Sequence, residues 1–244
     1  MRKAPRLPLR LWRGFARGAG LSLGLWASGA AADCVSRAEY DGPTTRYAHG
    51  VLGDDVEYGA LKLWVQGLVK TVILPQDRVF EDLEPRLVDV DLDGCNDVIV
   101  VESQADRGAQ LAAYAGSGEK IAATPHIGRR NRWLAPIGAA DMDGDGHVEI
   151  AYIDRPHLAK TLRVWRFKDG GLTEVASAPG FTNHRIGWDY IEGGVRDCGQ
   201  GPEMIVADGG WQRVIALQLE GGRLTSRDLG RYASSAVEAA MACK

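Results

Sequence analysis

An internal fourfold repeat constrains the fold of this chain more than any other feature of its sequence. Four strand-like segments begin 49, 51 and 52 residues apart: ALKLWV (60–65), AQLAAY (109–114), KTLRVW (160–165) and QRVIAL (212–217). Each is followed by a turn of glycine and polar residues and then by another short extended piece. This period predicts several copies of one small structural unit in a repeat architecture.

Further strand-like runs precede three of these segments. VIVVE (98–102), IAYID (150–154) and MIVAD (204–208) each end in an acid, and acidic loops entered from RLVDVD (86–91) or APIGAAD (135–141) precede the first two. One repeat therefore reads as four strands, and no long helical pattern follows residue 33. The sequence predicts an all-β fold, a β-propeller of about four four-stranded antiparallel blades. A flat β-solenoid and a pair of sandwiches are the alternatives.

The first repeat lacks a clear first strand, and the C-terminal segment SAVEAAMACK (235–244) has no place in the repeat. We expect this segment to be a strand that closes the ring against the first blade, so that no sheet edge stays open. Four cysteines (Cys34, Cys95, Cys198 and Cys243) indicate two disulfides, with three possible pairings. Ring closure would favour Cys34–Cys243 as a lock at the seam.

The N-terminal segment has the features of an export signal. Residues 1–32 contain six basic residues, no acid, the apolar stretch AGLSLGLWASG and three final alanines. This pattern predicts a secretory signal peptide cleaved after about Ala32, which leaves 33–244 as one propeller domain. An uncleaved anchor or a disordered start is the alternative, and the apolar stretch is too short for a permanent span. We expect a periplasmic or secreted protein with no stable membrane insertion after cleavage.

The net charge of the mature chain limits the classes of partner that it can bind. Loss of the six basic residues shifts the formal net charge from −3 to −9. An acidic exported protein is poorly suited to nucleic acid, so we expect none among its partners.

Two acidic loops match each other at an offset of 52 residues: DVDLDGCND (89–97) and DMDGDGHVE (141–149). Alternating carboxylates converge when such a loop curls, and the glycine at the sixth position permits the bend. Oxygen ligands with this charge suit Ca²⁺. The ligands predicted in the first loop are Asp89, Asp91, Asp93, Asp97 and the Cys95 carbonyl. Those predicted in the second are Asp141, Asp143, Asp145, Glu149 and the His147 carbonyl.

Two other interpretations of these loops are an EF-hand and an acidic turn without a ligand. An EF-hand needs a glutamate at position twelve and a following helix, but Val100 and Tyr152 occupy that position in apparent strands. An acidic turn that binds nothing remains the alternative, because Asp and Gly are common turn residues. Two loops in register, each with a full set of acids, favour the metal.

These loops with their following strands, DVDLDGCNDVIVVE and DMDGDGHVEIAYID, resemble the FG-GAP/VCBS repeat of integrin α-like propellers. The resemblance covers about residues 85–230 and, more faintly, 47–65. It implies a propeller with Ca²⁺ held in hairpins between first and second strands, usually in secreted or cell-surface proteins. The family favours aspartate where Glu149 stands, and 195–203 has lost two carboxylates. We therefore expect two calcium ions.

The face opposite the acidic loops is the expected binding face, because alternate connections of a meander emerge on opposite sides. The predicted ligand-binding residues are Arg130, Arg132, Trp133, Asp154, His184, Arg185, Trp188, Asp208 and Trp211. Trp and Arg dominate binding hot spots, and aromatic platforms beside polar groups suit sugars. The alternative is that these residues pair with acids and cover strand ends. His157 and His184 are interpreted as loop residues rather than catalytic ones.

The sequence favours an exported calcium-stabilised module that binds a protein or glycan partner. It contains no nucleophile elbow, phosphate-binding glycine loop or zinc-spaced cluster. A carbohydrate- or phosphate-ester-active enzyme (lyase or hydrolase) and a structural or assembly subunit are the alternatives. An acid–histidine pair deep in a pocket of the binding face would favour the enzyme, and a flat apolar-rimmed patch the binder.

Overall fold

A computed structural model describes residues 33–244, so the predicted signal peptide lies outside the described part. An eight-stranded sheet runs in the order β1-β2-β4-β6-β7-β8, with β3 also paired to β2 and β5 to β6. Blade 1 is its first part: β1 (Val35–Thr44), β2 (Glu57–Val65) and β3 (Leu68–Ile73). Blade 2 is the rest: β4 (Arg78–Phe80), β5 (Arg86–Val88), β6 (Asp97–Gln104), β7 (Gly108–Tyr114) and β8 (Lys120–Ala123).

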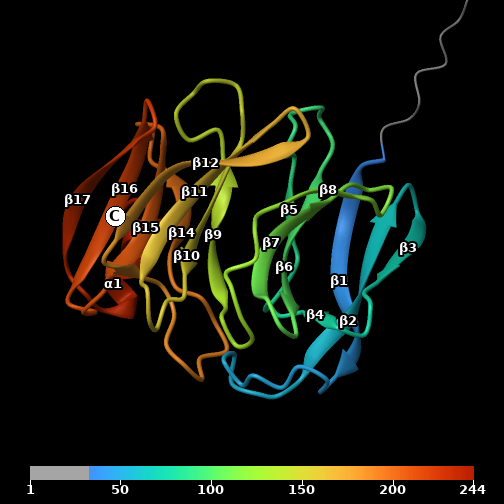
Figure 1. Ribbon diagram of the computed structural model, residues 1–244. Coiled ribbons are helices and arrows are strands. Elements are labelled where there is room, and N and C mark those ends of the chain that lie inside the picture. The colour runs from blue at the N-terminus through green and yellow to red at the C-terminus, as the bar shows by residue number, and fades with distance from the viewer. Residues whose placement is uncertain (1–32) are drawn as a thin grey trace, which may run out of the picture. The chain divides into compact units, whose positions relative to one another are not determined.

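The third and fourth repeats form separate antiparallel sheets (Figure 1). Blade 3 contains β9 (Leu134–Ala140), β10 (Glu149–Asp154), β11 (Thr161–Lys168) and β12 (Gly171–Pro179). Blade 4 contains β13 (Phe181–Thr182), β14 (Gly194–Asp197), β15 (Pro202–Asp208), β16 (Arg213–Glu220) and β17 (Arg223–Arg231). The all-β fold and the strands expected from the repeat are confirmed.

Packing between successive blades buries both faces of inner strands such as β6. On β6, Val98 and Val100 belong to the core between blades 1 and 2, while Ile99 and Val101 belong to the core between blades 2 and 3. Blades 3 and 4 enclose a further core around Ile153. Continuous hydrophobic runs such as VIVV therefore reflect packing on two sides rather than one solvated face.

The C-terminal segment corrects the prediction of ring closure. Residues Ser234–Met241 form helix α1, and its Val237 and Ala240 pack on blade 4. Alanine, glutamate and methionine favour a helix, and the spacing of three between these two apolar residues places them on one helical face. Within residues 33–244 no strand pairing joins blade 1 to blade 4, so a closed four-bladed ring is not seen.

The two expected disulfides are present, but the expected Cys34–Cys243 pairing is wrong. The bonds are Cys34–Cys95 and Cys198–Cys243. The backbone amide of Val35 donates to the carbonyl of Asn96 at 3.0 Å, which brings the start of β1 to the loop before β6 rather than to the C-terminus. Two disulfides indicate an oxidising, extracellular or periplasmic environment. No helix within the described range is long and apolar enough to span a membrane.

Candidate functional site

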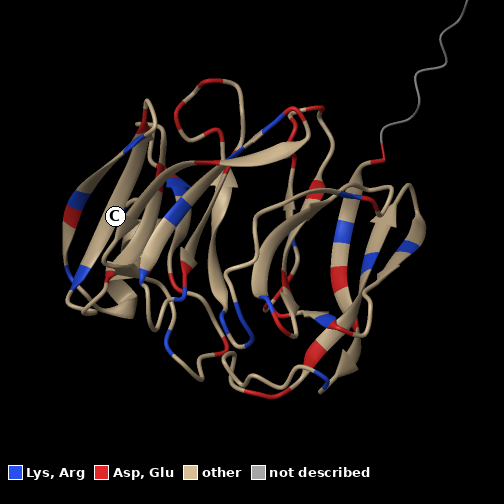
Figure 2. Ribbon diagram, in the orientation of Figure 1, with Lys and Arg blue, Asp and Glu red and all other residues tan. Residues whose placement is uncertain are grey.

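The predicted metal loops and the predicted binding face lie at opposite ends of the blades (Figures 1 and 2). Acidic loop 1 (89–97) connects β5 to β6, and acidic loop 2 (141–149) connects β9 to β10. The loops before β2, before β9 and after β13 emerge at the other end, which is called the pocket face below.

Acidic loop 1 curls around its own carboxylates. Asp89 accepts the backbone amides of Asp93 at 3.1 Å and Gly94 at 2.9 Å, and Asp93 accepts that of Cys95 at 2.8 Å. Gly94 has φ +90°, a conformation that other residues rarely adopt. Carboxylate oxygens of Asp89, Asp91 and Asp93 lie within 4.8 Å of one another.

Acidic loop 2 repeats this geometry. Asp141 accepts the amides of Asp145 at 3.1 Å and Gly146 at 3.0 Å. Glu149 accepts the amide of Met142 at 2.8 Å, as Asp97 accepts that of Val90 at 3.3 Å in the first loop. The clustered carboxylates here are those of Asp141, Asp143 and Glu149.

The donor sets of both loops fit calcium. In acidic loop 1, none of the four acids forms an ion pair with any described residue. Burial, together with the charges of the neighbouring acids, raises the pKa of Asp97 to about 6. In acidic loop 2, the Oδ1 atom of Asp143 is buried without a hydrogen-bond partner in the described structure. A hard cation would satisfy both arrangements.

The corresponding region of blade 4 does not fit a metal. Glu203 stands where Glu149 stands in blade 3, and its two oxygens pair with Arg196 at 2.7 Å and Arg227 at 2.6 Å. These cations hold its pKa below the usual range even though burial opposes the shift. The two arginines therefore already provide the positive charge that a metal ion would otherwise supply to Glu203.

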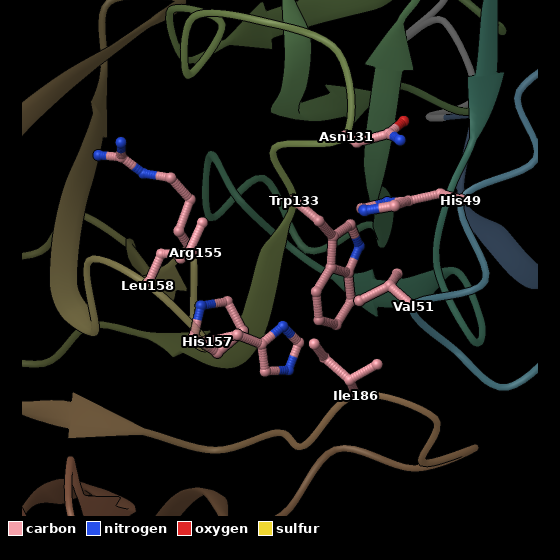
Figure 3. Close-up of a pocket in the computed structure, with 9 residues that line it drawn as sticks. His49, Val51, Asn131, Trp133, Arg155, His157, Leu158 and Ile186 are labelled. Carbon is pink, nitrogen blue, oxygen red and sulfur yellow. The ribbon is translucent and has the colours of Figure 1, made fainter.

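The pocket face contains a cavity of about 260 Å³ (Figure 3). Its lining comes from four loops: His49, Val51, Asn131, Trp133, Arg155, Pro156, His157, Leu158 and Ile186. Trp133 forms the floor, with 2% of its surface exposed and its indole N–H donating to the carbonyl of Glu81 at 2.8 Å. At the rim, Leu158 is 63% and Ile186 71% exposed.

A chain of hydrogen bonds determines the protonation of His157. The Nε2 atom of His184 lies 3.0 Å from the Trp188 carbonyl, which can only accept, so this nitrogen carries the proton. Burial lowers the pKa of His184, and burial together with His184 lowers that of His157 to about 4. With both rings neutral, His157 Nε2 donates to His184 Nδ1 at 3.1 Å. The His157 Nδ1 atom is therefore an unprotonated acceptor.

His49 is oriented from below by a buried acid. Its Nδ1 atom contacts the carboxylate of Glu81, whose other oxygen accepts a hydrogen bond from the Ser103 hydroxyl. Glu81 is fully buried, and burial raises its pKa. His49 lines the pocket and Glu81 lies buried behind it, so an acid–histidine pair of the kind expected for an enzyme stands at the edge of this cavity.

The predicted ligand-binding residues separate into three groups. Trp133 lines the cavity, and His184 lies directly behind it. Arg185, Trp188 and Trp211 form an aromatic cluster with Tyr190 and Tyr232, in which the Arg185 guanidinium lies 4.4 Å from the Trp211 ring. The remaining four lie outside both the cavity and the cluster: Arg130, Arg132, Asp154 and Asp208.

Those four residues have structural contacts. Asp154 is buried between Arg155 at 2.7 Å and Arg163 at 3.0 Å. Asp208 accepts the backbone amides of Gln212 and Arg213, both at 2.6 Å. Arg130 lies over the Tyr47 ring at 4.7 Å, and the Arg132 carbonyl accepts the amide of Ala109. The side chains of Asp154, Asp208 and Arg130 thus have contacts within the protein, and ligand binding by these four residues stays a prediction.

Sequence reasoning missed His49, Glu81 and the role of His157. His49 lies in the loop before β2, and Glu81 lies in the segment between β4 and β5. The repeat contained a usable signal, because connections on the pocket face come from every blade. Including the first repeat's YAHGV segment in the same mouth would have placed His49 there.

One comparison with known protein families agrees with the repeat. Residues 89–152, which include both acidic loops, match the model of the FG-GAP-like repeat. Among solved structures, the exotype rhamnogalacturonan lyase YesX superposes with a TM-score of 0.42 at 16% identity, covering 70% of this chain and 40% of that one. The rhamnogalacturonan lyase YesW gives 0.39 at 17% identity, covering 74% and 44%.

The chain spans less than half the length of either lyase. No curated protein matches the sequence. By its match over residues 89–152, the chain contains an FG-GAP-like repeat.

Proposed function

We propose that this protein is an exported, calcium-stabilised binding module that holds a neutral sugar of a glycan in the cavity of the pocket face. The observation behind this proposal is the fixed acceptor His157 Nδ1 beside an apolar floor. A sugar offers hydroxyl donors for such an acceptor and C–H surface for Trp133 and Val51.

The charge of the cavity supports a neutral ligand. The only guanidinium in its lining, that of Arg155, is already engaged by both oxygens of Asp154, at 2.7 and 3.1 Å. No acid is among the residues that line the cavity. An anionic ligand would find no free cation there and would meet the lone pair of His157.

Glycan-array binding with purified protein tests this proposal. We expect His157→Phe to weaken binding of a neutral glycan at least about tenfold, because it removes the acceptor while filling similar volume. His126→Phe is the matched control, since His126 is half-buried outside the cavity. Binding only to peptides, or unchanged glycan binding by His157→Phe, would contradict the proposal.

The calcium part of the proposal has a separate test. Chelation with EDTA should lower the melting temperature, and Ca²⁺ should restore it where Mg²⁺ does not, because these loops offer many flexible oxygen ligands rather than an octahedral site. An unchanged melt and no bound metal in the purified protein would exclude calcium.

A second candidate is a glycan lyase or hydrolase that uses the same cavity. The buried carboxylate of Glu81 fixes His49 in the arrangement of a general base. If the protein is an enzyme, His49→Gln should lower kcat at least about a hundredfold with little change in the dissociation constant of the glycan. Absence of turnover on any glycan that the protein binds would leave binding as its function.

A further inference from the structure

The two acidic loops differ in one charged neighbour. In acidic loop 2 the guanidinium of Arg166, on β11, reaches three predicted calcium ligands: Asp143 at 2.6 Å, Asp145 at 2.8 Å and Glu149 at 2.5 Å. Arg166 is 20% exposed and Glu149 fully buried, so solvent screens this contact only in part.

Acidic loop 1 has no counterpart to Arg166. Arg166 stands directly opposite Glu149 in the pairing of β10 with β11. In blade 2, Val98 pairs with Tyr114, so the residue opposite Asp97 is Ala115. The Ala115 side chain is an uncharged methyl group, and no cationic side chain among the described residues forms an ion pair with the four carboxylates of this loop.

The blades therefore form a series. Blade 2 has four loop acids without an arginine, blade 3 has four acids with Arg166, and in blade 4 Glu203 is held by Arg196 and Arg227. Positive charge from the protein increases along this series, and the set of acids is reduced only in blade 4. Even so, Asp143 Oδ1 in blade 3 is buried and unpartnered, so acidic loop 2 keeps an oxygen available to a metal.

We propose that Arg166 is a built-in counter-ion that makes acidic loop 2 fold without metal and bind Ca²⁺ more weakly than acidic loop 1. The guanidinium offsets part of the carboxylate repulsion that calcium alone offsets in acidic loop 1. It also occupies one oxygen each of Asp143, Asp145 and Glu149 and must share them with an incoming ion. This inference rests on calcium binding by the loops, which is part of the proposed function.

Isothermal titration of EDTA-treated, dialysed protein with CaCl₂ tests the inference. We expect two binding steps whose dissociation constants differ by at least about tenfold. Asp91→Asn should remove the tight step, and Asp143→Asn should remove the weak one.

Arg166→Gln should tighten the weak step at least about tenfold and lower the melting temperature of the calcium-free protein. Arg163→Gln is the control, because Arg163 lies on the same strand and pairs with Asp154 and Glu174, away from both loops. Its titration should match that of the unaltered protein. Arg166→Lys keeps the positive charge but lacks the planar guanidinium that contacts three carboxylates, so it should give an intermediate calcium affinity. This variant provides a test if Arg166→Gln does not fold.

The outcomes separate this inference from the proposed function. Two equally tight steps in the unaltered protein, or a weak step that Arg166→Gln leaves unchanged or weakens, would overturn the role of Arg166 alone. No calcium binding in either loop would overturn the proposed metal and this inference together.

Discussion

Buried carboxylates lie beneath the pocket face, and their environments differ residue by residue. Asp82 is paired with Arg86 at 2.5 and 3.1 Å, and Glu81 contacts His49 and Ser103. Glu57 is 2% exposed at the start of β2, and no ion pair of Glu57 is found within residues 33–244. Burial, followed by the charges of Glu81 and Asp54, raises its pKa to about 9.

This shift predicts a pH dependence of stability. Between about pH 4.5 and pH 9 the folded protein keeps the Glu57 proton that the unfolded chain releases, so rising pH destabilises the fold across that window. Glu57→Gln should raise the melting temperature at pH 8 by about 4–8 °C, for a gain on the order of 2 kcal/mol, and leave it unchanged at pH 4. Calorimetry at both pH values checks this, with exposed Glu84→Gln as control. An equal gain at pH 4 would contradict the assigned cause.

At the scale of single elements, α1 replaces the expected closing strand. It covers one face of blade 4, where Val237 and Ala240 join Ile205, Val214 and Ala216 in a core. The other face of blade 4 packs on blade 3, so α1 gives this sheet a second buried side.

The contribution of α1 can be measured by truncating its buried side chain. Val237→Ala should lower the free energy of unfolding by about 1–3 kcal/mol through lost burial and the cavity left behind. Glu238→Ala changes an exposed neighbour in the same helix and should have an effect below about 0.5 kcal/mol. Urea denaturation distinguishes the two, and equal effects would show that α1 is not packed as described.

At the scale of the whole molecule, each disulfide ties one end of the described residues to a loop, β5–β6 in blade 2 or β14–β15 in blade 4. Cys95 is the seventh residue of acidic loop 1, and Cys198 lies in the corresponding loop of blade 4. The first bond spans 61 residues and the second 45. Each restricts the unfolded chain, and the first also holds the loop whose carbonyl is a predicted calcium ligand.

Removing each bond should therefore have different consequences. The double variant Cys34→Ser/Cys95→Ser and the double variant Cys198→Ser/Cys243→Ser should each lose about 2–4 kcal/mol of stability. Only the first should weaken the tight calcium step, because only Cys95 lies within acidic loop 1. Thermal melts and calcium titrations of both variants check this, and equal calcium affinities would contradict the coupling.

The sequence by itself determined the repeat, the strands and the two acidic loops. These depend on neighbours along the chain: the short apolar runs VIVV and IAYI, and the spacing of Asp89, Asp91 and Asp93 with Gly94. Patterns among residues that are close in the sequence recur in each blade, so they can be identified from composition and repeat period.

Only the tertiary structure decided the disulfide pairing, the helical C-terminus, the His49–Glu81 contact and the position of Arg166. Each joins residues from different strands or loops, so it depends on strand register and on how blades stack. A shift of one residue in the β10–β11 pairing would turn Arg166 to the other face of the sheet, away from Glu149. Nothing in the spacing of either segment alone specifies that contact.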